Sequence, residues 1–519
     1  MKKYSLAILV FVTATLAFAE IKMPAIFGHK MMFQQQQPIN IWGTAKPNSE
    51  VKVMFNFKYT TTKADVNGNW KMTLPAEQAS FRELALVVYE DDIPNVEFTN
   101  ILVGEVWIAG GQSNMEWKVG QSSDKEKAKK NAKKLNGKMR YFMQSSNGYS
   151  KVEKDEFQKG AHWMSVNENN VCTTSAVGYY FAERLIEDLN VPVGIIYASK
   201  GATRMDCWTD KQTLMQGWGK DFAQVGGMIK TLENYTDAEY QKLLKAHKEK
   251  LAKHDAKVAK AKKEGKPIPT VAWDFRYPPS SESPEKDFKT PTIHFNGKIA
   301  PMRNFGVRGV LWYQGESDAN GEFLKHYTES FGMLIDCWRK RLQNKDLPFI
   351  QVQLASYETK SDWAKAREAQ YQNTKLYKNV YMAPIIDTGE AKNIHPHDKT
   401  TVGARMEKIA LDKIYKRAEY ASDFPVMKSV QFKGNEAVVS FNTFGRKLTG
   451  KGDARGFEIL VDGKWQKANV TLSGENVIAK STNEKTIAGV RYLWKNWTRP
   501  EAWLFNRDGI PAIPFSTSK

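Results

Sequence analysis

The feature that most constrains the fold of this chain is an alternation of strand-like and helix-like segments between residues 101 and 420. The strand-like segments are short, apolar and rich in β-branched residues, while the segments between them have the apolar period of amphipathic helices. This alternation favours a parallel sheet covered by helices on both faces. The predicted strands span residues 103–109, 139–143, 193–198, 307–313, 349–354 and 380–386, and the predicted helices span 176–189, 321–342, 363–377 and 402–418.

The segments on either side of this region have a different pattern. Residues 20–100 show period-two alternation and hairpin turns without a helical period, which predicts a small N-terminal β-sandwich. Residues 421–519 return to short β-runs and predict a C-terminal β-module. The predicted fold class is therefore α/β, with β-sandwich or jelly-roll-like modules added at both ends, whether separate or joined. A chain of 519 residues is too long for one core, which agrees with several domains.

The N-terminus has the composition of a secretory signal peptide at residues 1–19. Lys2 and Lys3 are followed by an apolar run at 6–16 and by the small-x-small sequence Ala17-Phe-Ala19. The run is too short for a membrane anchor, and no later stretch approaches about 18 apolar residues. We expect a secreted or periplasmic protein that has no membrane partner.

Residues 215–300 interrupt the α/β pattern and carry much of the formal charge of +19. Lysines dominate 242–266, where Leu244, Leu251 and Val258 follow heptad spacing, and this predicts a solvated helical insertion. Residues 278–284 are rich in Pro and Ser and are expected to be loop. Lysines without arginines or interleaved aromatics are a poor footprint for nucleic acid, so we expect no nucleic-acid partner.

The chain has three cysteines, which allow at most one disulfide. The Cys and His spacings of a structural zinc site are absent. We expect no metal.

The residues that follow the predicted strands are those needed for acyl transfer. Ser113 follows the first strand after two glycines, Gly201 follows the third, Gln314 the fourth, and Asp387 and then His395 follow the last. In a parallel sheet these strand ends share one edge. A hydroxyl that attacks, an imidazole that takes its proton and N–H donors for an oxyanion would meet there. The alternative is an ordinary Gly/Ser turn and a loop histidine held by backbone.

Three segments carry a resemblance to a known family. GQSNM at 111–115, WYQGES at 312–317 and IHP at 394–396, followed by Lys399, resemble the carbohydrate O-acetylesterases of the SGNH (GDSL-like) hydrolase superfamily. The sialate O-acetylesterase branch is most similar. Further matching positions at 296–301 and 490–515 extend the resemblance over nearly the whole mature chain. It implies a three-layer SGNH-like catalytic domain at residues 101–420.

The resemblance also implies roles for individual residues. Ser113 would be the nucleophile, and its own N–H, the Gly201 N–H and the Gln314 side chain would form the oxyanion hole. His395 would be the base that later protonates the leaving sugar hydroxyl. One departure is Ala202, which stands where the family often has a second glycine.

The acid that orients the histidine is a second departure. Related enzymes commonly have Asp shortly before this histidine, whereas Asn393 stands here. Asp387 is our first candidate and Glu390 the second, and a Ser–His dyad oriented by a backbone carbonyl is a third possibility.

Two further residues are candidates for substrate binding. Arg204 could pair with a substrate carboxylate, or could be an ordinary surface arginine. Glu316 could touch substrate, or could anchor its own loop.

These observations predict a secreted serine esterase that removes O-acetyl groups from carbohydrate through an acetyl-enzyme on Ser113. Sialic acid is the leading substrate, and acetylated xylan is the alternative with the same mechanism. The chemistry needs no cofactor. An alternative from another class is a non-catalytic carbohydrate-binding or adhesion protein on the same scaffold.

Overall fold

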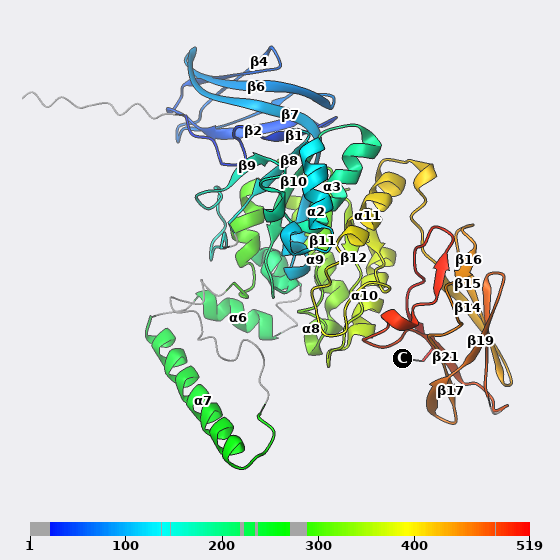
Figure 1. Cartoon of the computed structure of the whole chain (residues 1–519). Helices are drawn as coiled ribbons and strands as arrows, with labels where there is room; N and C mark the ends of the chain where they lie inside the picture. The colour runs from blue at the N-terminus through cyan, green and yellow to red at the C-terminus, as the bar shows by residue number, and fades with distance from the viewer. Residues whose placement is uncertain are drawn as a thin grey trace, which may run out of the picture.

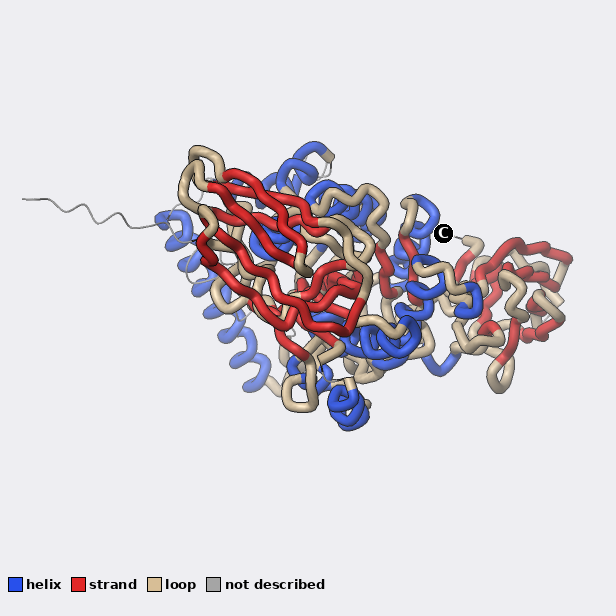
Figure 2. The backbone as a smooth tube through the Cα atoms, turned by 90° about the horizontal axis from the view of Figure 1, so that it is seen from above, coloured by secondary structure: helices blue, strands red, loops and turns tan. Residues whose placement is uncertain are grey.

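The computed structural model describes residues 21–135, 137–145, 147–217, 223–233, 237–269, 288–482 and 484–518. The predicted signal peptide at 1–19 and the Pro-rich segment at 278–284 lie outside these residues. A central α/β body is flanked by an N-terminal group of strands and, at another side, by a C-terminal group (Figure 1). Seen from above, the C-terminal strands form a separate group at one side of the molecule (Figure 2).

The central sheet has the strand order β13-β12-β11-β7-β10-β8-β9. Neighbouring strands pair in parallel except for β9, which is antiparallel to β8. The parallel sheet predicted from the alternation is therefore confirmed. Its strands are β7 (Ile93–Gly111), β8 (Met139–Met143), β9 (His162–Ser165), β10 (Val193–Ser199), β11 (Gly309–Tyr313), β12 (Phe349–Val352) and β13 (Val380–Ala383).

Strand β7 shows why these segments are apolar throughout. Val106 and Ile108 belong to the core on one face of the sheet, while Trp107 and Ala109 belong to the core on the other. Successive side chains of a strand point to opposite faces, so a sheet covered on both sides needs apolar residues at every position.

Helices cover both faces of the sheet. Helices α3 and α11 pack against each other over one face, together with α2, and α9 and α10 cover the other. The structure thus has the three layers of the predicted fold. These helices are α2 (Lys125–Lys134), α3 (Ala176–Leu189), α9 (Tyr327–Arg341), α10 (Trp363–Leu376) and α11 (Thr400–Ile409).

Two predicted helices are divided in the structure. The segment 321–342 forms α8 (Gly321–Lys325) and α9, which meet at His326. The segment 402–418 is α-helical only to Ile409 and continues as a π-helical turn, Ala410–Ile414. Lys416 then adopts a φ of +59°, in the left-handed region, which ends the helix.

The N-terminal strands form two sheets. Strands β2 and β5 pair with each other, whereas β1 and β6 pair with β7, and β3 and β4 extend that sheet beyond β6. Because β7 continues into the central sheet, the predicted boundary at residue 100 falls inside a strand. The remaining strands are β1 (Met32–Gln34), β2 (Ile39–Thr44), β3 (Glu50–Phe55), β4 (Lys58–Lys63), β5 (Asn69–Leu74) and β6 (Ser80–Glu90).

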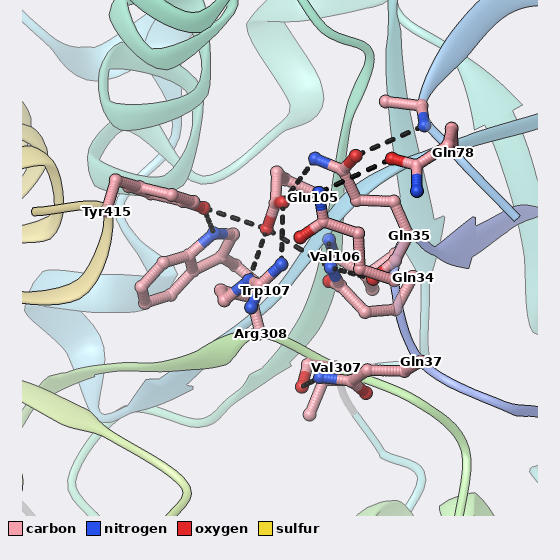
Figure 3. A network of polar contacts seen from close by, with 12 residues as sticks. Gln34, Gln35, Gln37, Gln78, Glu105, Val106, Trp107, Val307, Arg308 and Tyr415 are labelled. Atoms are coloured by element: carbon pink, nitrogen blue, oxygen red, sulfur yellow. Dashed lines mark hydrogen bonds and ion pairs between the residues drawn. The ribbon is translucent and has the colours of Figure 1, made fainter. Parts of the chain in front are cut away.

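A buried carboxylate ties this region to the α/β body (Figure 3). Glu105 of β7 accepts hydrogen bonds from Gln34 and Gln35 of the N-terminal region, at 3.2 and 2.7 Å. It also accepts two from Arg308, at 2.7 and 3.0 Å, and one from the Tyr415 hydroxyl at 2.8 Å. Each carboxylate oxygen is thereby satisfied, as a buried charge requires.

The C-terminal module contains two four-stranded antiparallel sheets, β14-β15-β20-β19 and β18-β17-β21-β23, and the pair β16-β22. Apolar residues from these strands form their own core. The strands are β14 (Val426–Lys433), β15 (Glu436–Asn442), β16 (Leu448–Gly450), β17 (Phe457–Val461), β18 (Lys464–Lys467), β19 (Asn469–Ser473), β20 (Asn476–Lys480), β21 (Gly489–Tyr492), β22 (Leu504–Asn506) and β23 (Phe515–Ser516).

Three helices lie at the start of the insertion or within it. They are α4 (Lys211–Gln216), α6 (Ala223–Glu233) and the lysine-rich α7 (Asp237–Lys263), which projects away from the α/β body (Figure 1). No helix among the described residues is both long and apolar enough to cross a membrane. The three cysteines, Cys172, Cys207 and Cys337, are all free.

Candidate active site

Ser113 lies at the carboxyl end of the central strand β7, where it begins the short helix α1 (Ser113–Glu116). The turn depends on Gly111, whose φ is +134°. A Cβ at this position would lie 2.2 Å from the carbonyl oxygen of Tyr313, so only glycine fits. Ser113 is partly exposed, and its backbone N–H is one of those that a helix leaves without an internal partner.

Two further predicted site residues, Gly201 and Gln314, follow the strands on either side of β7. In the sheet register, Gly111 is opposite Ser199 of β10 and opposite Tyr313 of β11. Gly201 and Gln314 follow those two strand ends and therefore flank the serine turn. A Cβ built on Gly201 would lie 3.3 Å from the Cβ of Ser113.

His395 lies beside the same turn. Its ring stacks on Trp117, four residues after Ser113, with 4.9 Å between ring centroids and 19° between the planes. The side chain of Asn114 donates to the carbonyl of Ile394 at 3.0 Å, which fixes the histidine loop against the serine turn. The structure thus brings the serine turn and the imidazole to one edge of the sheet, as the strand order requires.

Asn114 connects three loops of this edge. Besides bonding Ile394, its Nδ2 donates to Glu316 Oε1 at 2.6 Å, and its Oδ1 accepts from the Lys399 ammonium. Glu316 therefore anchors its loop to the serine turn, which is the structural alternative considered for it. Its role in substrate binding stays a prediction.

The surroundings of His395 favour the neutral imidazole. Burial lowers the pKa of His395 below its ordinary value, the charge of Lys399 lowers it further, and the charge of Glu116 opposes both. Burial also lowers the pKa of Lys399 to about 7. A histidine that is neutral near pH 7 can act as a general base.

The two carboxylates proposed to orient His395 are bound elsewhere. Both oxygens of Asp387 accept from Arg405, at 2.6 and 2.7 Å. Glu390 accepts from the backbone N–H of His397 at 2.9 Å and lies 2.7 Å from Nδ1 of the same residue. Among the described residues no hydrogen bond joins either carboxylate to the His395 ring. Asp387 and Glu390 are thus held by other partners in this structure, and the group that orients His395 stays a prediction.

Two of the three predicted oxyanion donors, the Gly201 N–H and the Gln314 side chain, are engaged in this structure. The Gly201 N–H donates to Glu116 Oε2 at 2.6 Å. The Gln314 side chain is fully buried and donates to the Thr203 carbonyl at 3.2 Å and to Asp318. Burial raises the pKa of Asp318 to about 7. The structure places both donors beside the serine turn without presenting either one to it.

Arg204 is not a free surface residue. Its guanidinium donates to Asp206 at 2.9 Å and to the carbonyl of Lys289 at 3.2 Å, and it lies 4.5 Å from the ring centroid of Phe323. Its predicted pairing with a substrate carboxylate would compete with Asp206.

Sequence reasoning assigned no role to Asn114, Glu116 or the buried Lys298. Glu116 could have been found, because a side chain three residues after Ser113 lies on the same helical face. Lys298 could not be found by its spacing, because it lies in a segment that does not follow any of the predicted strands. No group of three or more His, Cys, Asp or Glu side chains within the described ranges could hold a metal ion.

Comparison with known proteins gives the family of this chain. A family profile described as carbohydrate esterase, sialic acid-specific acetylesterase, matches residues 103–258 and 294–412. A sialate O-acetylesterase from Mus musculus is 24% identical over 538 aligned residues, which cover 93% of this chain and 92% of the relative. The human sialate O-acetylesterase is 23% identical, with 93% and 90% covered.

A solved structure is similar over nearly the whole chain. It is the crystal structure of a carbohydrate acetylesterase from Xanthomonas citri, with 29% identity and a TM-score of 0.78, covering 96% of this chain and 100% of that one. The match includes the modules at both ends of the α/β body. With its matching profile and its three-layer fold, this chain belongs to the carbohydrate esterase family of sialic acid-specific acetylesterases, hydrolases that act on carboxylic esters.

Proposed function

We propose that this protein is a serine esterase that removes O-acetyl groups from sialic acid. The observation that carries the proposal is the stack of His395 on Trp117, because it holds an imidazole against the turn that begins with Ser113. The likeness to sialate O-acetylesterases over 93% of the chain supports the choice of sugar.

The reaction follows the template of serine acyl transfer. His395 takes the proton of the Ser113 hydroxyl while the oxygen attacks the acetyl carbonyl, and a tetrahedral oxyanion forms. The carbon–oxygen bond to the sugar then breaks, and the imidazolium gives its proton to the sugar oxygen. Water deprotonated by His395 attacks the acetyl-enzyme, and acetate leaves as Ser113 regains its proton.

Oxyanion stabilisation falls to N–H groups around the serine turn. The N–H of Ser113 and of Gly201 are the donors that support this step, and Gln314 is the third candidate. Removing a single donor of this kind costs about 10²–10³ in kcat. The Gly201 N–H becomes available only when Glu116 releases it, since that carboxylate accepts it in the free protein.

The substrate is tested by acetate release from O-acetylated sialic acid and from acetylated xylan under the same conditions. We expect kcat/KM to be higher for the sialate, and Ser113→Ala to abolish release. Release from xylan alone would replace sialate by the hemicellulose alternative. Binding of the acetylated sugar without acetate release would favour the adhesion alternative.

Arg204 offers a sharper test of sugar choice. If its guanidinium meets the sialate carboxylate, Arg204→Gln should raise KM for acetylated sialic acid and leave KM unchanged for an uncharged acetyl ester. An equal rise for both substrates would assign Arg204 to support of the loop through Asp206.

We also propose that the protein is exported and loses residues 1–19. Two lysines, an apolar run and Ala17-Phe-Ala19 support this reading. N-terminal sequencing of the exported protein should begin at Glu20, whereas a protein that retains Met1 inside the cell would contradict export.

A further inference from the structure

Glu116 holds the donor that the proposed reaction needs. Its Oε2 accepts the Gly201 N–H at 2.6 Å, a short, charge-assisted hydrogen bond. A Cβ built on Gly201 would lie 3.1 Å from Glu116 Oε2 and 3.3 Å from Ser113 Cβ, so the carboxylate oxygen and the nucleophilic residue crowd the same glycine. The carboxylate occupies the place at Gly201 where a developing oxyanion would bind.

A carboxylate in this position opposes the reaction. The N–H can serve the oxyanion only if it is free, and two negative charges close together in a partly buried site repel each other. Glu116 must therefore leave Gly201 before the tetrahedral intermediate forms, and it needs another partner when it does.

Lys298 is a suitable partner. It is fully buried, and its ammonium donates to the carbonyl of Ser199, two residues before Gly201, at 3.3 Å. An ammonium has three donors, and Ser199 is the one acceptor that the described residues give it. Burial lowers the pKa of Lys298 to about 7, and the nearby charge of Glu116 counteracts this shift. The cation thus lies within electrostatic reach of Glu116 and has N–H groups to spare.

We propose that Glu116 and Lys298 form a latch on the oxyanion donor. In the free enzyme Glu116 holds the Gly201 N–H; when the ester carbonyl binds, the carboxylate moves to Lys298 and releases it. Both are positioning residues that act through Gly201. The proposal rests on the proposed function, because it takes Ser113 as the nucleophile beside this donor.

The test compares Glu116→Gln, Lys298→Met and the double variant, using acetyl ester hydrolysis and inhibition by methylboronic acid. A boronic acid forms a tetrahedral adduct with the serine oxygen and places a hydroxyl at the oxyanion donor. Glu116→Gln weakens the competing hydrogen bond by removing its charge, so we expect methylboronic acid to bind about tenfold more tightly. Glu126→Gln, at an exposed glutamate of α2, is the matched control and should change nothing.

Lys298→Met removes the ammonium to which the Glu116 carboxylate would move, while keeping the length and apolar stem of the side chain. We expect kcat/KM to fall about tenfold, and the double variant to regain the level of Glu116→Gln. A merely structural role for Lys298 would not be relieved by a change at Glu116. Weaker boronic acid binding in Glu116→Gln, or a double variant as slow as Lys298→Met, would overturn the latch.

The outcomes separate the latch from the proposed function. Wild-type protein that neither hydrolyses acetyl esters nor binds boronic acid would refute the function itself. Active protein whose variants lack the expected pattern would refute the latch alone. If Lys298→Met does not fold, boronic acid binding by Glu116→Gln still decides between the latch and a supporting role for Glu116.

Discussion

His395 is the residue whose environment sets the pH range of the proposed reaction. Burial and the charge of Lys399 lower its pKa below the ordinary value of 6.5. The base form therefore persists at pH values below those at which a free histidine becomes protonated. The acid limb of the kcat/KM profile should lie below pH 6.5, because that limb reports the free enzyme's base.

Lys399→Met is expected to move this acid limb to higher pH, because removing a nearby cation makes protonation of His395 easier. The measurement is kcat/KM against pH on an uncharged acetyl ester. Lys392→Met is the control, since that lysine is exposed on the same loop and paired with Glu358. An acid limb that stays in place or moves to lower pH would contradict the electrostatic role of Lys399.

Asn114→Leu is expected to lower kcat about a hundredfold with little change in KM. The substitution keeps the size of the side chain but removes its bonds to Glu316, Ile394 and Lys399, and misplacement of catalytic groups by about 1 Å can cost 10²-fold. Asn169→Leu at an exposed position is the control. A kcat within a factor of two of the wild type would show that the three loops hold their positions without Asn114.

At the residue scale, sequence reasoning could place Ser113, Gly201, Gln314 and His395 at one edge because each follows a strand end. It could not find the partners of Asp387 and Glu390. The partners of these carboxylates depend on where their side chains point in the loop after the last strand. They also depend on how the helix that carries Arg405 packs, and no local sequence pattern specifies this. The same holds for the bond between Glu116 and Gly201, which depends on the register of β7 and β10.

At the element scale, β7 connects two parts of the molecule, because it belongs to both the N-terminal region and the central sheet. Glu105, in the second half of this strand, bonds residues from three parts of the chain (Figure 3). Removing one partner of a buried ion pair typically costs about 3–5 kcal/mol, because the other charge is left without compensation.

Glu105→Gln should therefore lower the free energy of unfolding by about 3 kcal/mol, with a clear shift of the urea midpoint to lower concentration. Glu322→Gln, which breaks an exposed ion pair with Lys325, should cost less than about 1 kcal/mol. Equal urea midpoints for the two variants would mean that the hydrogen bonds of Glu105 add little to the free energy of unfolding.

One helix was missed, and the ends of others were harder to predict than their positions. Helix α2 had no sequence signal, since only Ala128 and Ala132 of its lysine-rich run are buried. The predicted helix at 321–342 is divided at His326, which neither Pro nor Gly marks. Strand positions were predicted better, because strands buried on both faces must be apolar throughout.

At the scale of the whole molecule, the C-terminal module is tied to the catalytic edge. Arg367 of α10 is fully buried and donates to the carbonyls of Leu354 and Ala355 and of Lys495 and Asn496. Arg499 donates to the carbonyl of Gly389 at 2.7 Å, on the segment that leads to His395. The module therefore supports the histidine loop as well as its own core.

Arg367→Met should loosen this joint, because four carbonyls lose a donor and each buried unsatisfied group costs about 1–3 kcal/mol. We expect a lower melting temperature and faster proteolytic cleavage between the α/β body and the C-terminal strands. Arg417→Met, at an exposed arginine paired with Glu419, is the control. Unchanged cleavage would mean that other contacts suffice to hold the module.

The order of modules along the chain could be predicted from changes in hydrophobic period alone. The contacts between the modules could not be predicted, because β7, Glu105 and Arg367 make them with partners that are far away in the sequence. Residues 34 and 35 reach Glu105 because β1 pairs with β7.

The most direct test of the central claim is covalent labelling with a fluorophosphonate followed by peptide mapping. The account predicts one modified peptide, containing Ser113, that is absent from Ser113→Ala and forms much more slowly in His395→Ala. Modification of a different serine, or labelling that is equally fast without His395, would contradict it.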